Sequence, residues 1–583
     1  MRYLKLAQLY EEASSTTKRL EKTKILSKFL LQLSSEDKDV MYLLMGDIYP
    51  EYDERRIGIS NQLAIKAIAK ATGTESSEVT KQWKKIGDLG KVSEALTKQK
   101  TQATLHNQII TTEKVITNLR KLPELEGHGT VSKKIGLITE LLTSASAIEA
   151  KYLVRTLIGD LRIGMQESTI REALADAFFT NKKDAAPKIQ KAIDKTNDLS
   201  AVFEIAKKGK MKKLEKLNLE VGKPIKAMLA QKALTIKEGF KNVGKPCAIE
   251  FKYDGFRMII HKQGDKVFLF TRSLENVTKQ FPEVVDYILK FVKGNSFILD
   301  SEAVGFDSKT KEYQPFQNIS QRIRRKYNIE DMQKKLPVEI NIFDILYYEG
   351  KSFLDEPFEK RFGLIRKIIT NKPYKIISSK AIISGDEKKV EFFYKKALAA
   401  NQEGIMMKNL KAGYQPGRRV GHMLKIKPEE KDLDLVITGA EYGAGKRSGW
   451  MSSFILSCRG KKKGEYLEIG KMGTGIKEKL ASPSSSKDVE RKEKDSEVTF
   501  DILTKKLTPL ITKEKGKRVE IKPKIIISVT YQEIQKSPNY NSGWALRFPR
   551  FVALRPDKPL SEIADLKEVE NDFIKQKRNW KYG

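Results

Sequence analysis

Cysteine is scarce in this sequence: Cys247 and Cys458 are the only two in 583 residues. Two cysteines cannot build a disulfide framework or a structural zinc site, and Cys247 falls within a predicted strand. We interpret both side chains as buried thiols of a protein that works in a reducing compartment.

Long apolar runs are also missing. No uninterrupted stretch reaches about eighteen residues, the length that a membrane-spanning helix needs. The first residues, Met1 to Lys5, carry no apolar signal region. We expect a cytoplasmic protein without a membrane partner. The hydrophobic content of 40% still allows real cores, and the length predicts about three or four domains.

Acidic residues are too few to balance the basic ones. The chain has 75 Asp and Glu against 110 Lys and Arg, a net charge of +35, and the basic residues run through its whole length. A polyanionic partner is the first inference, since neutralised phosphates give long-range attraction and salt-dependent affinity. A basic protein that is merely soluble is the alternative.

The periodicity of apolar residues changes twice along the chain. Residues 1–220 show apolar positions three and four apart, which predicts an all-helical domain. Strands alternate with helices over residues 221–430, after glycine and proline break the helical pattern, and a mixed α/β domain is expected there. Short strands with glycine-rich turns dominate residues 431–583 and predict a small β-barrel with a C-terminal helical tail.

Two turns of the first domain combine glycine with cations at helix starts. One contains Arg155, Arg162 and Gly164, and the other contains Ser132 and Lys134. Backbone amides and basic side chains in such turns suit phosphate oxygens. Either turn taken alone is equally compatible with an ordinary helix connection.

The middle domain carries the segment Glu250-Phe-Lys252-Tyr-Asp-Gly255-Phe-Arg257. Alternating residues on both sides predict that Lys252 ends a half-buried strand, just before a tight turn at Gly255. A lysine held there can act as a nucleophile when burial or a cation such as Arg257 lowers its pKa, because only the neutral amine attacks. An ordinary surface lysine is the alternative.

Charged side chains also follow other predicted strands. Arg272 follows a strand over residues 266–271, Glu302 follows the apolar run that begins at Phe297, and Glu403 precedes another apolar run. Two carboxylates at strand ends, near a lysine and a polyphosphate, are suitable ligands for Mg²⁺. Each residue taken singly is also compatible with a plain charge at a strand end.

An aromatic residue and further cations complete the pattern. Phe343 caps the strand predicted over residues 338–342, where its ring can stack on a base. Lys425 and Lys427 are two apart and point to the same face of a strand. Arg555 and Lys558 form a basic pair near the end of the chain. A core aromatic and solvated cations are the alternatives for these residues taken one by one.

In this order and spacing, these motifs resemble the nucleotidyltransferase motifs of ATP-dependent DNA ligases of the archaeal and eukaryotic replicative type. The resemblance covers nearly the whole chain. The two basic turns resemble that family's helical DNA-binding domain, and Ala440 to Trp450 resembles the opening of its OB-fold domain. It implies a multidomain fold with an all-α DNA-binding domain, a mixed α/β nucleotidyltransferase domain and a β-barrel OB-fold domain.

The resemblance also implies a reaction. Lys252 would attack the α-phosphate of ATP, forming a phosphoramidate to AMP and releasing pyrophosphate. The AMP would then move to the 5′-phosphate of a nick, and the 3′-hydroxyl would displace it. Nick sealing of this kind serves DNA replication, repair and recombination.

The remaining residues take roles from the same resemblance. Glu250 would accept a hydrogen bond from the adenine amino group, and Phe343 would stack on the ring. Arg257 and Arg272 would contact the ribose and phosphate side, with Glu302 and Glu403 near the ribose and the Mg²⁺. The cations expected on the phosphates are Arg419, Lys425 and Lys427 for the α-phosphate, and Arg555 and Lys558 for the pyrophosphate during the first step.

The resemblance also implies binding partners. We expect a monomer that binds nicked duplex DNA. Archaeal relatives bind the sliding clamp through a short aromatic segment near residue 100, whereas this chain has Gln99-Lys-Thr-Gln-Ala103 without aromatics.

Three other functions share part of this pattern. An NAD-dependent ligase would require a four-cysteine zinc module. An RNA ligase or capping enzyme usually lacks the long helical domain in front. A non-enzymatic DNA-binding protein would not require Lys252, Glu302, Glu403, Lys425 and Lys427 together.

Overall fold

A computed structural model describes residues 1–100, 109–323, 327–428, 431–444, 447–478 and 498–582. The chain folds into two compact units, one formed by Met1–Val79 with Leu89–Lys427 and the other by Thr80–Asp88 with Pro428–Gly583. Within the described residues, no helix is both long and apolar enough to cross a membrane.

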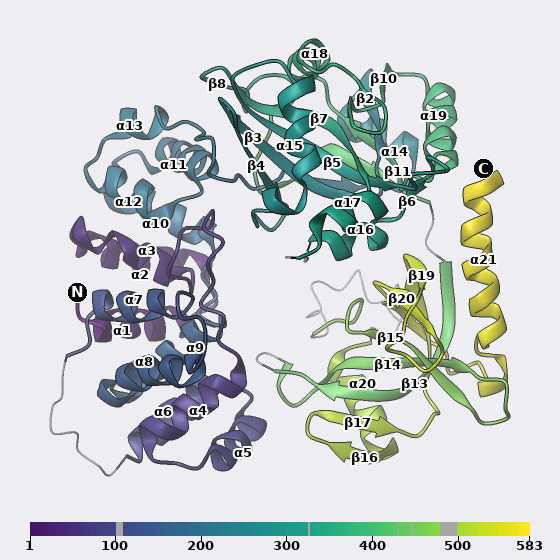
Figure 1. Ribbon diagram of the computed structural model, residues 1–583. Coiled ribbons are helices and arrows are strands. Elements are labelled where there is room, and N and C mark those ends of the chain that lie inside the picture. Colours follow the sequence, from purple (N-terminus) through teal and green to yellow (C-terminus); the bar gives the residue numbers. More distant parts are fainter. Residues whose placement is uncertain (101–108, 324–326, 429–430, 445–446, 479–497, 583) are drawn as a thin grey trace, which may run out of the picture. The chain divides into compact units, whose positions relative to one another are not determined.

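Helices occupy the first third of the chain (Figure 1). They are α1 (Tyr3–Ser14), α2 (Arg19–Leu31), η1 (Glu36–Asp39), α3 (Val40–Leu44), α4 (Asn61–Thr72), α5 (Ser76–Ile86), α6 (Leu89–Lys98), α7 (Thr112–Lys121), α8 (Thr130–Ser144), α9 (Ala147–Leu157), α10 (Glu167–Phe178), α11 (Lys182–Thr196), α12 (Leu199–Lys207) and α13 (Met211–Glu215). The described part of residues 1–220 contains no strand, so the helical periodicity is confirmed there.

Helix α9 shows how the sequence sets these elements. Ser146 and Glu149 form a capping box that satisfies backbone amides at its start. The helix is buried along its length and packs against α6 and α1. It therefore lies in the core of the helical region and carries Arg155 near its end.

The middle region contains two sheets and the helices that cover them. The first sheet has the order β1 (Leu229–Lys232), β12 (Arg419–Ile426), β11 (Gly404–Lys408), β2 (Cys247–Lys252) and β10 (Ala381–Ser384). The second sheet has the order β4 (Lys266–Thr271), β3 (Phe256–Gln263), β5 (Ser296–Phe306), β7 (Val338–Tyr348) and β8 (Lys351–Ser352), with β6 (Tyr313–Gln314) on β5 and β9 (Ile376–Ser378) on β7. The helices are α14 (Ile236–Val243), η2 (Thr278–Gln280), α15 (Pro282–Phe291), α16 (Phe316–Ile323), α17 (Ile329–Lys335), α18 (Phe358–Ile368) and α19 (Glu387–Ala399).

Strand β2 is buried on both faces, so the prediction of a half-buried strand was wrong. Cys247, Ile249 and Phe251 pack into a cluster with α14 and α19, whereas Ala248 packs into the core of the second sheet. Because side chains alternate along a strand, Glu250 and Lys252 face the same side as Ala248. The space between the two sheets therefore receives the side chains of both predicted site residues.

The last region is dominated by strands. Its sheet has the order β15 (Tyr466–Met472), β14 (Met451–Arg459), β13 (Lys431–Tyr442), β17 (Arg518–Ile521) and β16 (Ile511–Lys515), with β18 (Ile526–Tyr531) joining β13 to β21 (Arg550–Leu554). A separate hairpin pairs β19 (Glu533–Lys536) with β20 (Trp544–Arg547). The helices are α20 (Phe500–Leu507), η4 (Thr508–Leu510), η5 (Leu560–Glu562) and α21 (Leu566–Tyr582). The strand pairing among the described residues does not close this sheet into a barrel.

Candidate functional site

Lys252 is the last residue of β2, and the turn that follows depends on a glycine. A Cβ on Gly255 would come within 2.3 Å of the carbonyl oxygen of Ala303 on β5. Glycine therefore allows the β2–β3 turn to press against the second sheet. The backbone amide of Asp254 also donates to the side chain of Gln402, at 3.0 Å. These contacts fix Lys252 at the end of the strand.

Three side chains meet at this strand end. The Lys252 ammonium lies 2.7 Å from a carboxylate oxygen of Glu403, and Lys427 pairs with the same oxygen. Glu403 stands just before β11, whose Gly404 pairs with Lys252 across the sheet. Burial alone would raise the pKa of Glu403, but Lys252 and Lys427 outweigh it and hold the pKa at about 2. Glu403 is therefore ionised at neutral pH.

Lys425 and Arg419 add to this concentration of positive charge. Burial lowers the pKa of Lys425, and the cations Lys427, Lys252 and Arg419 lower it further. The register of β12 against β1 shifts between Val420 and Leu424, and the Arg419 guanidinium donates to the carbonyl of Ala230 on β1, at 2.8 Å. We call Lys252, Glu403, Arg419, Lys425 and Lys427 the outer cluster. It holds four cations and one carboxylate.

Glu302 faces this cluster from the second sheet, where it pairs with Arg257 in the register of β3 and β5. Burial raises the pKa of Glu302 to about 8 although Lys252 and Arg257 oppose the rise, and the charge of Glu403 adds to it. The two carboxyl groups are thus close enough to repel each other, an arrangement that fits a divalent cation. Among the described residues, no group of three or more His, Cys, Asp or Glu is placed to hold a metal alone.

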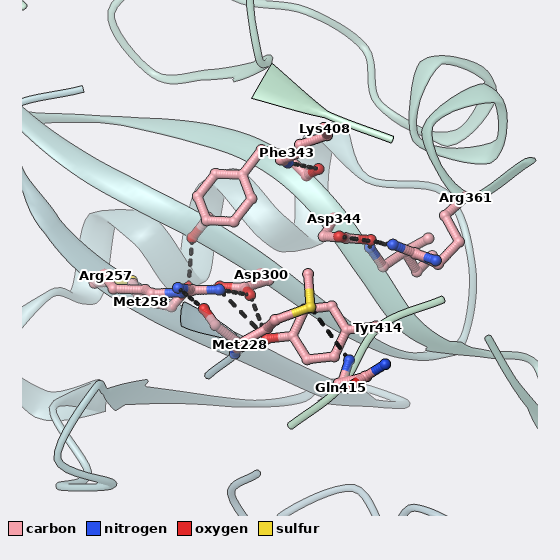
Figure 2. Close-up of polar contacts among 12 residues, drawn as sticks. Met228, Arg257, Met258, Asp300, Phe343, Asp344, Arg361, Lys408, Tyr414 and Gln415 are labelled. Atoms are coloured by element: carbon pink, nitrogen blue, oxygen red, sulfur yellow. Dashed lines mark hydrogen bonds and ion pairs between the residues drawn. The ribbon is translucent and has the colours of Figure 1, made fainter. Parts of the chain in front are cut away.

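Glu250 and Lys408 form a second, deeper group. The Lys408 ammonium lies 2.6 Å from one carboxylate oxygen of Glu250, and the side chains are 5% and 2% exposed. Lys408 also donates to the backbone carbonyl of Phe343, at 3.3 Å, and lies 4.8 Å from the centre of its ring (Figure 2). We call Glu250, Phe343 and Lys408 the inner cluster. Its charged pair is buried and electrically balanced, and Phe343 is half-buried.

Arg257 is held by the protein itself. Its guanidinium donates to Asp300 at 2.8 Å and to the carbonyl of Met228 at 2.6 Å, and Tyr414 donates to the same Asp300 at 2.6 Å. Figure 2 shows these side chains as one connected group. The guanidinium lies 5.2 Å from the centre of the Phe343 ring. Most of its donors are therefore used within the fold.

Two predicted positions were wrong in their local structure. Phe343 does not cap a strand, because β7 continues through it to Tyr348. Glu302 does not follow a strand, because β5 runs on to Phe306. Both residues lie inside long strands that span the second sheet. Arg272 is exposed in the turn after β4, and Thr271 beside it pairs with Met258 at the sheet end that carries Arg257.

The predicted phosphate-binding residues of the helical region differ in burial and in their contacts. Ser132 lies in the first turn of α8 and Lys134 lies just after it, and Gly129 is the N-cap. Arg162 has a φ of 56° and pairs with Asp160 at 2.6 Å. Arg155 is 5% exposed and donates to the carbonyl of Leu161. Its burial favours support of the turn rather than contact with a ligand.

The chain is also tightly packed at Gly164, the second glycine of the turn that carries Arg162. Gly164 has a φ of 64°, and a Cβ there would come within 2.7 Å of the Lys22 ammonium. Lys22 in turn donates to the carbonyl of Ile163. The second glycine of the turn therefore allows a lysine from α2 to approach the backbone.

Arg555 and Lys558 are paired within the C-terminal region. Both approach the same carboxylate oxygen of Asp434, at 2.9 Å and 2.6 Å. Arg555 also pairs with Asp557 at 2.7 Å. Asp434 lies on β13 and has an exposed side-chain fraction of 11%. One acidic residue thus holds both predicted cations.

Sequence reasoning missed four of these residues: Asp300, Lys408, Tyr414 and Asp434. Asp300 interrupts an apolar run, and that interruption was a usable signal. Lys408 ends the segment that begins at Glu403, but its approach to Glu250 depends on the pairing of β11 with β2. The contacts of Tyr414 and Asp434 join segments distant in sequence, so no local pattern indicates them.

Known proteins resemble this chain over nearly its whole length. Family models match for the DNA ligase N terminus at residues 2–175, the ATP dependent DNA ligase domain at 227–427 and the ATP dependent DNA ligase C terminal region at 447–558. A DNA ligase of Nanoarchaeum equitans is 43% identical over 99% of both chains. One from Thermococcus onnurineus is 39% identical over 99% of both.

Solved structures also resemble it. The structure described as Pmar-Lig_Pre has a TM-score of 0.57 and 17% identity, and the match covers 94% of this chain and 99% of that one. At this identity the likeness concerns the fold alone. The full-length identity to archaeal DNA ligases and the three matched models decide the family. The chain belongs to the ATP-dependent DNA ligases.

Proposed function

We propose that this enzyme, which seals nicks in duplex DNA with ATP, carries AMP on Lys252. The supporting observation is the contact between Lys252 and Glu403, whose carboxylate also holds Lys427. The Lys252 ammonium loses a proton to solvent, and the neutral Nζ then attacks the α-phosphate. The bond to pyrophosphate breaks as the P–N bond forms, and the nitrogen releases a second proton to solvent to give the phosphoramidate. Because its pKa is about 2, Glu403 is a poor proton acceptor at neutral pH. Its role is to orient the amine.

The outer cluster stabilises the charge on the phosphates. Arg419, Lys425 and Lys427 spread positive charge around the α-phosphate during the attack. Glu302 and Glu403 would hold Mg²⁺ together with phosphate oxygens, and the ion would supply further charge stabilisation for the leaving group. The 5′-phosphate of the nick then takes the AMP from Lys252, and the 3′-hydroxyl displaces it.

The inner cluster binds the base. Glu250 accepts from the adenine amino group, and the ring of Phe343 stacks on the base. Arg257, held by Asp300, and the exposed Arg272 lie on the ribose and phosphate side. Arg555 and Lys558 leave Asp434 to orient the pyrophosphate in the first step.

The chain has three domains: the DNA-binding domain at residues 1–220, the nucleotidyltransferase domain at 221–430 and the OB-fold domain at 431–583. We infer that the last of these is of the β-barrel OB-fold type with a helical tail, although its described strands pair as an open sheet. The enzyme acts as a monomer. It works in the cytoplasm, and the two buried free cysteines agree with such a reducing compartment. The segment from Gln99 that corresponds to clamp binding in relatives reaches into residues 101–108, which lie outside the described part of the chain.

The direct test is incubation with α-labelled ATP, followed by denaturing electrophoresis. Label should stay with the protein and should then pass to the 5′-phosphate of a nicked duplex. A protein that takes no label would contradict the role of Lys252. Transfer to nicked RNA, with none to nicked DNA, would instead favour the RNA ligase alternative.

The helical domain binds the duplex through phosphates, without reading its sequence. Lys134→Met should flatten the slope of log affinity against log salt by about one unit. Lys114→Met is the matched control, because Lys114 already pairs with Glu140 at 2.5 Å on the neighbouring helix. Binding isotherms on nicked duplex at several salt concentrations measure both. An unchanged slope for Lys134→Met would remove this residue from the interface.

A further inference from the structure

The buried ammonium of Lys408 contacts several groups of the protein. Its ammonium contacts one oxygen of Glu250 and the backbone carbonyl of Phe343, and it lies 4.5 Å from the centre of the Phe358 ring. Lys408 is 4% exposed. A lysine buried this deeply is normally paired, since an isolated charge loses its hydration. The pair is therefore a fixed feature of the site rather than a surface contact.

The contact leaves Glu250 with one unused oxygen. Oε2 faces Lys408, whereas Oε1 is buried and has no hydrogen-bond partner among the described residues. A buried acceptor without a partner is costly and calls for a ligand group that donates to it. Lys408 thus decides which carboxylate oxygen is left to meet a ligand.

Lys408 also decides the charge of that oxygen. Burial raises the pKa of Glu250, and the ammonium of Lys408 is the strongest opposing influence. The other charged groups near Glu250 are Asp344 on β7 and Arg361 on α18, which pair with each other at 2.7 Å (Figure 2). The nearby phenol of Tyr253 is kept protonated because burial raises its pKa. Loss of Lys408 would leave burial less opposed and would favour the protonated form of Glu250, whose O–H can donate.

We propose that Lys408 is a specificity-determining residue that holds Glu250 as an acceptor-only carboxylate, so that the ligase selects bases with an amino group at position 6. This inference rests on the proposed function, in which Glu250 reads adenine. An amino group donates to Oε1, whereas the carbonyl oxygen at position 6 of hypoxanthine or guanine would face it as a second acceptor. A site that forms a hydrogen bond with one base, and leaves its buried acceptor unpaired with the other base, discriminates strongly between the two.

The test compares ATP with ITP, which differs at position 6 and has no amino group at position 2. Single-turnover labelling is measured with both α-labelled nucleotides from pH 6 to 9, in wild type, Lys408→Met, Glu250→Gln and the double variant. Lys408→Met should narrow the ratio of ATP to ITP rates at least about tenfold. In Lys408→Met the ratio of ATP to ITP rates should widen as pH rises and Glu250 ionises, whereas the wild-type ratio should stay flat. Lys408→Arg, which keeps the charge, should restore most of the ratio.

The double variant separates positioning from a direct effect. If Lys408 acts through Glu250, adding Lys408→Met to Glu250→Gln should change the ratio little further. Thermal unfolding shows which variants fold, and Lys408→Gln replaces Lys408→Met if the latter does not. A narrowed ratio in Glu250→Gln but a wild-type ratio in the uncharged Lys408 variants overturns the inference alone. A wild-type ratio in all of them overturns the role of Glu250 in the proposed function as well.

Discussion

The inner and outer clusters differ in charge balance and in exposure. The inner cluster pairs one lysine with one carboxylate, both almost fully buried. The outer cluster gathers four cations around Glu403, and Lys252 is 22% exposed there. The middle domain therefore builds one dry, neutral end and one positive end that water reaches.

The difference teaches that the two ends do different work. A neutral buried pair contributes hydrogen-bond direction, because its charges cancel and its geometry is fixed by packing. The cations of the outer cluster repel one another, and a bound polyphosphate would neutralise this repulsion. Selectivity is expected to depend on the inner cluster, and rate is expected to depend on the outer cluster. Variants in each cluster test this division.

Lys252→Arg should have the largest effect. A guanidinium keeps its proton and cannot act as the amine nucleophile, so labelling by ATP should fall by at least about a thousandfold. The positive charge remains, so the fold and the binding of ATP should change little. Labelling with α-labelled ATP measures the first step, and a labelled Lys252→Arg protein would refute the assignment.

A pre-adenylated nick provides the control for this variant. Sealing of such a nick needs the 3′-hydroxyl to displace AMP and does not need Lys252 as a nucleophile. Lys252→Arg should therefore retain more of this activity than of self-labelling. Equal losses in both would mean that the substitution damages the outer cluster generally.

Glu403→Gln should slow labelling by about a hundredfold. The amide keeps the shape of the side chain but removes the one negative charge that holds Lys252 and Lys427 together. The two ammonium groups would then repel, and Nζ would lose its orientation. A titration of Mg²⁺ in the same assay measures whether the ion is bound more weakly. An unchanged rate with an unchanged Mg²⁺ curve would assign Glu403 to packing.

Glu356→Gln is the matched control. Glu356 also pairs with two lysines, Lys351 at 2.7 Å and Lys360 at 2.8 Å, but outside the candidate site. Loss of this carboxylate should leave labelling unchanged. A similar loss of activity in both variants would show that any broken lysine pair in the domain slows the enzyme.

Much of the fold could be predicted from periodicity, whereas the burial of particular strands could not. The strand that ends at Lys252 and the strand over residues 266–271 were predicted with these ends. Local alternation cannot show that a second layer covers the outer face of β2, because that layer comes from α14 and α19. The lengths of β5 and β7 were underestimated because polar residues, Glu302 among them, interrupt their apolar runs.

The candidate site was also predictable only in part. The sequence predicts that the cations at strand ends belong to one site, because their motifs occur in the order and spacing of a known family. The partners of those cations could not be read, since Asp300 meets Tyr414 and Asp434 meets Lys558 only after the chain folds. Which cations are held by the protein and which remain for a ligand is therefore a property of tertiary packing.

Lys558→Met should lower self-labelling about tenfold and should affect sealing of a pre-adenylated nick less. The outer cluster lacks a cation devoted to pyrophosphate, and Lys558 would supply it after leaving Asp434. Methionine avoids the repulsion that a glutamate would suffer 2.6 Å from that carboxylate. Single-turnover assays of both steps measure the effect. Equal losses in the two steps, or none in either, would rule out a role confined to the first step.

Lys431→Met is the control for a broken ion pair in the same region. Lys431 pairs with Asp572 at 3.3 Å and is not among the proposed site residues. It should change neither step. A selective loss of self-labelling in this variant would mean that the test reports stability of the C-terminal region rather than the chemistry of Lys558.

Glu302→Gln should change the stability of the free enzyme by an amount that depends on pH. Burial raises the pKa of Glu302 to about 8, whereas the same group in the unfolded chain titrates near its ordinary value. Between these two values the folded protein keeps a proton that the unfolded chain releases, so wild-type stability falls as pH rises, by at most about 1.4 kcal/mol per pH unit. The glutamine variant cannot titrate, and its stability relative to wild type should therefore increase from about pH 5 to pH 8. Denaturant unfolding without nucleotide or metal measures the difference, and Glu356→Gln should show no such gain because the pKa of Glu356 is lowered. A constant difference across this range would mean that Glu302 is ionised in the free enzyme and belongs with Glu403 as a second anionic partner of the outer cluster.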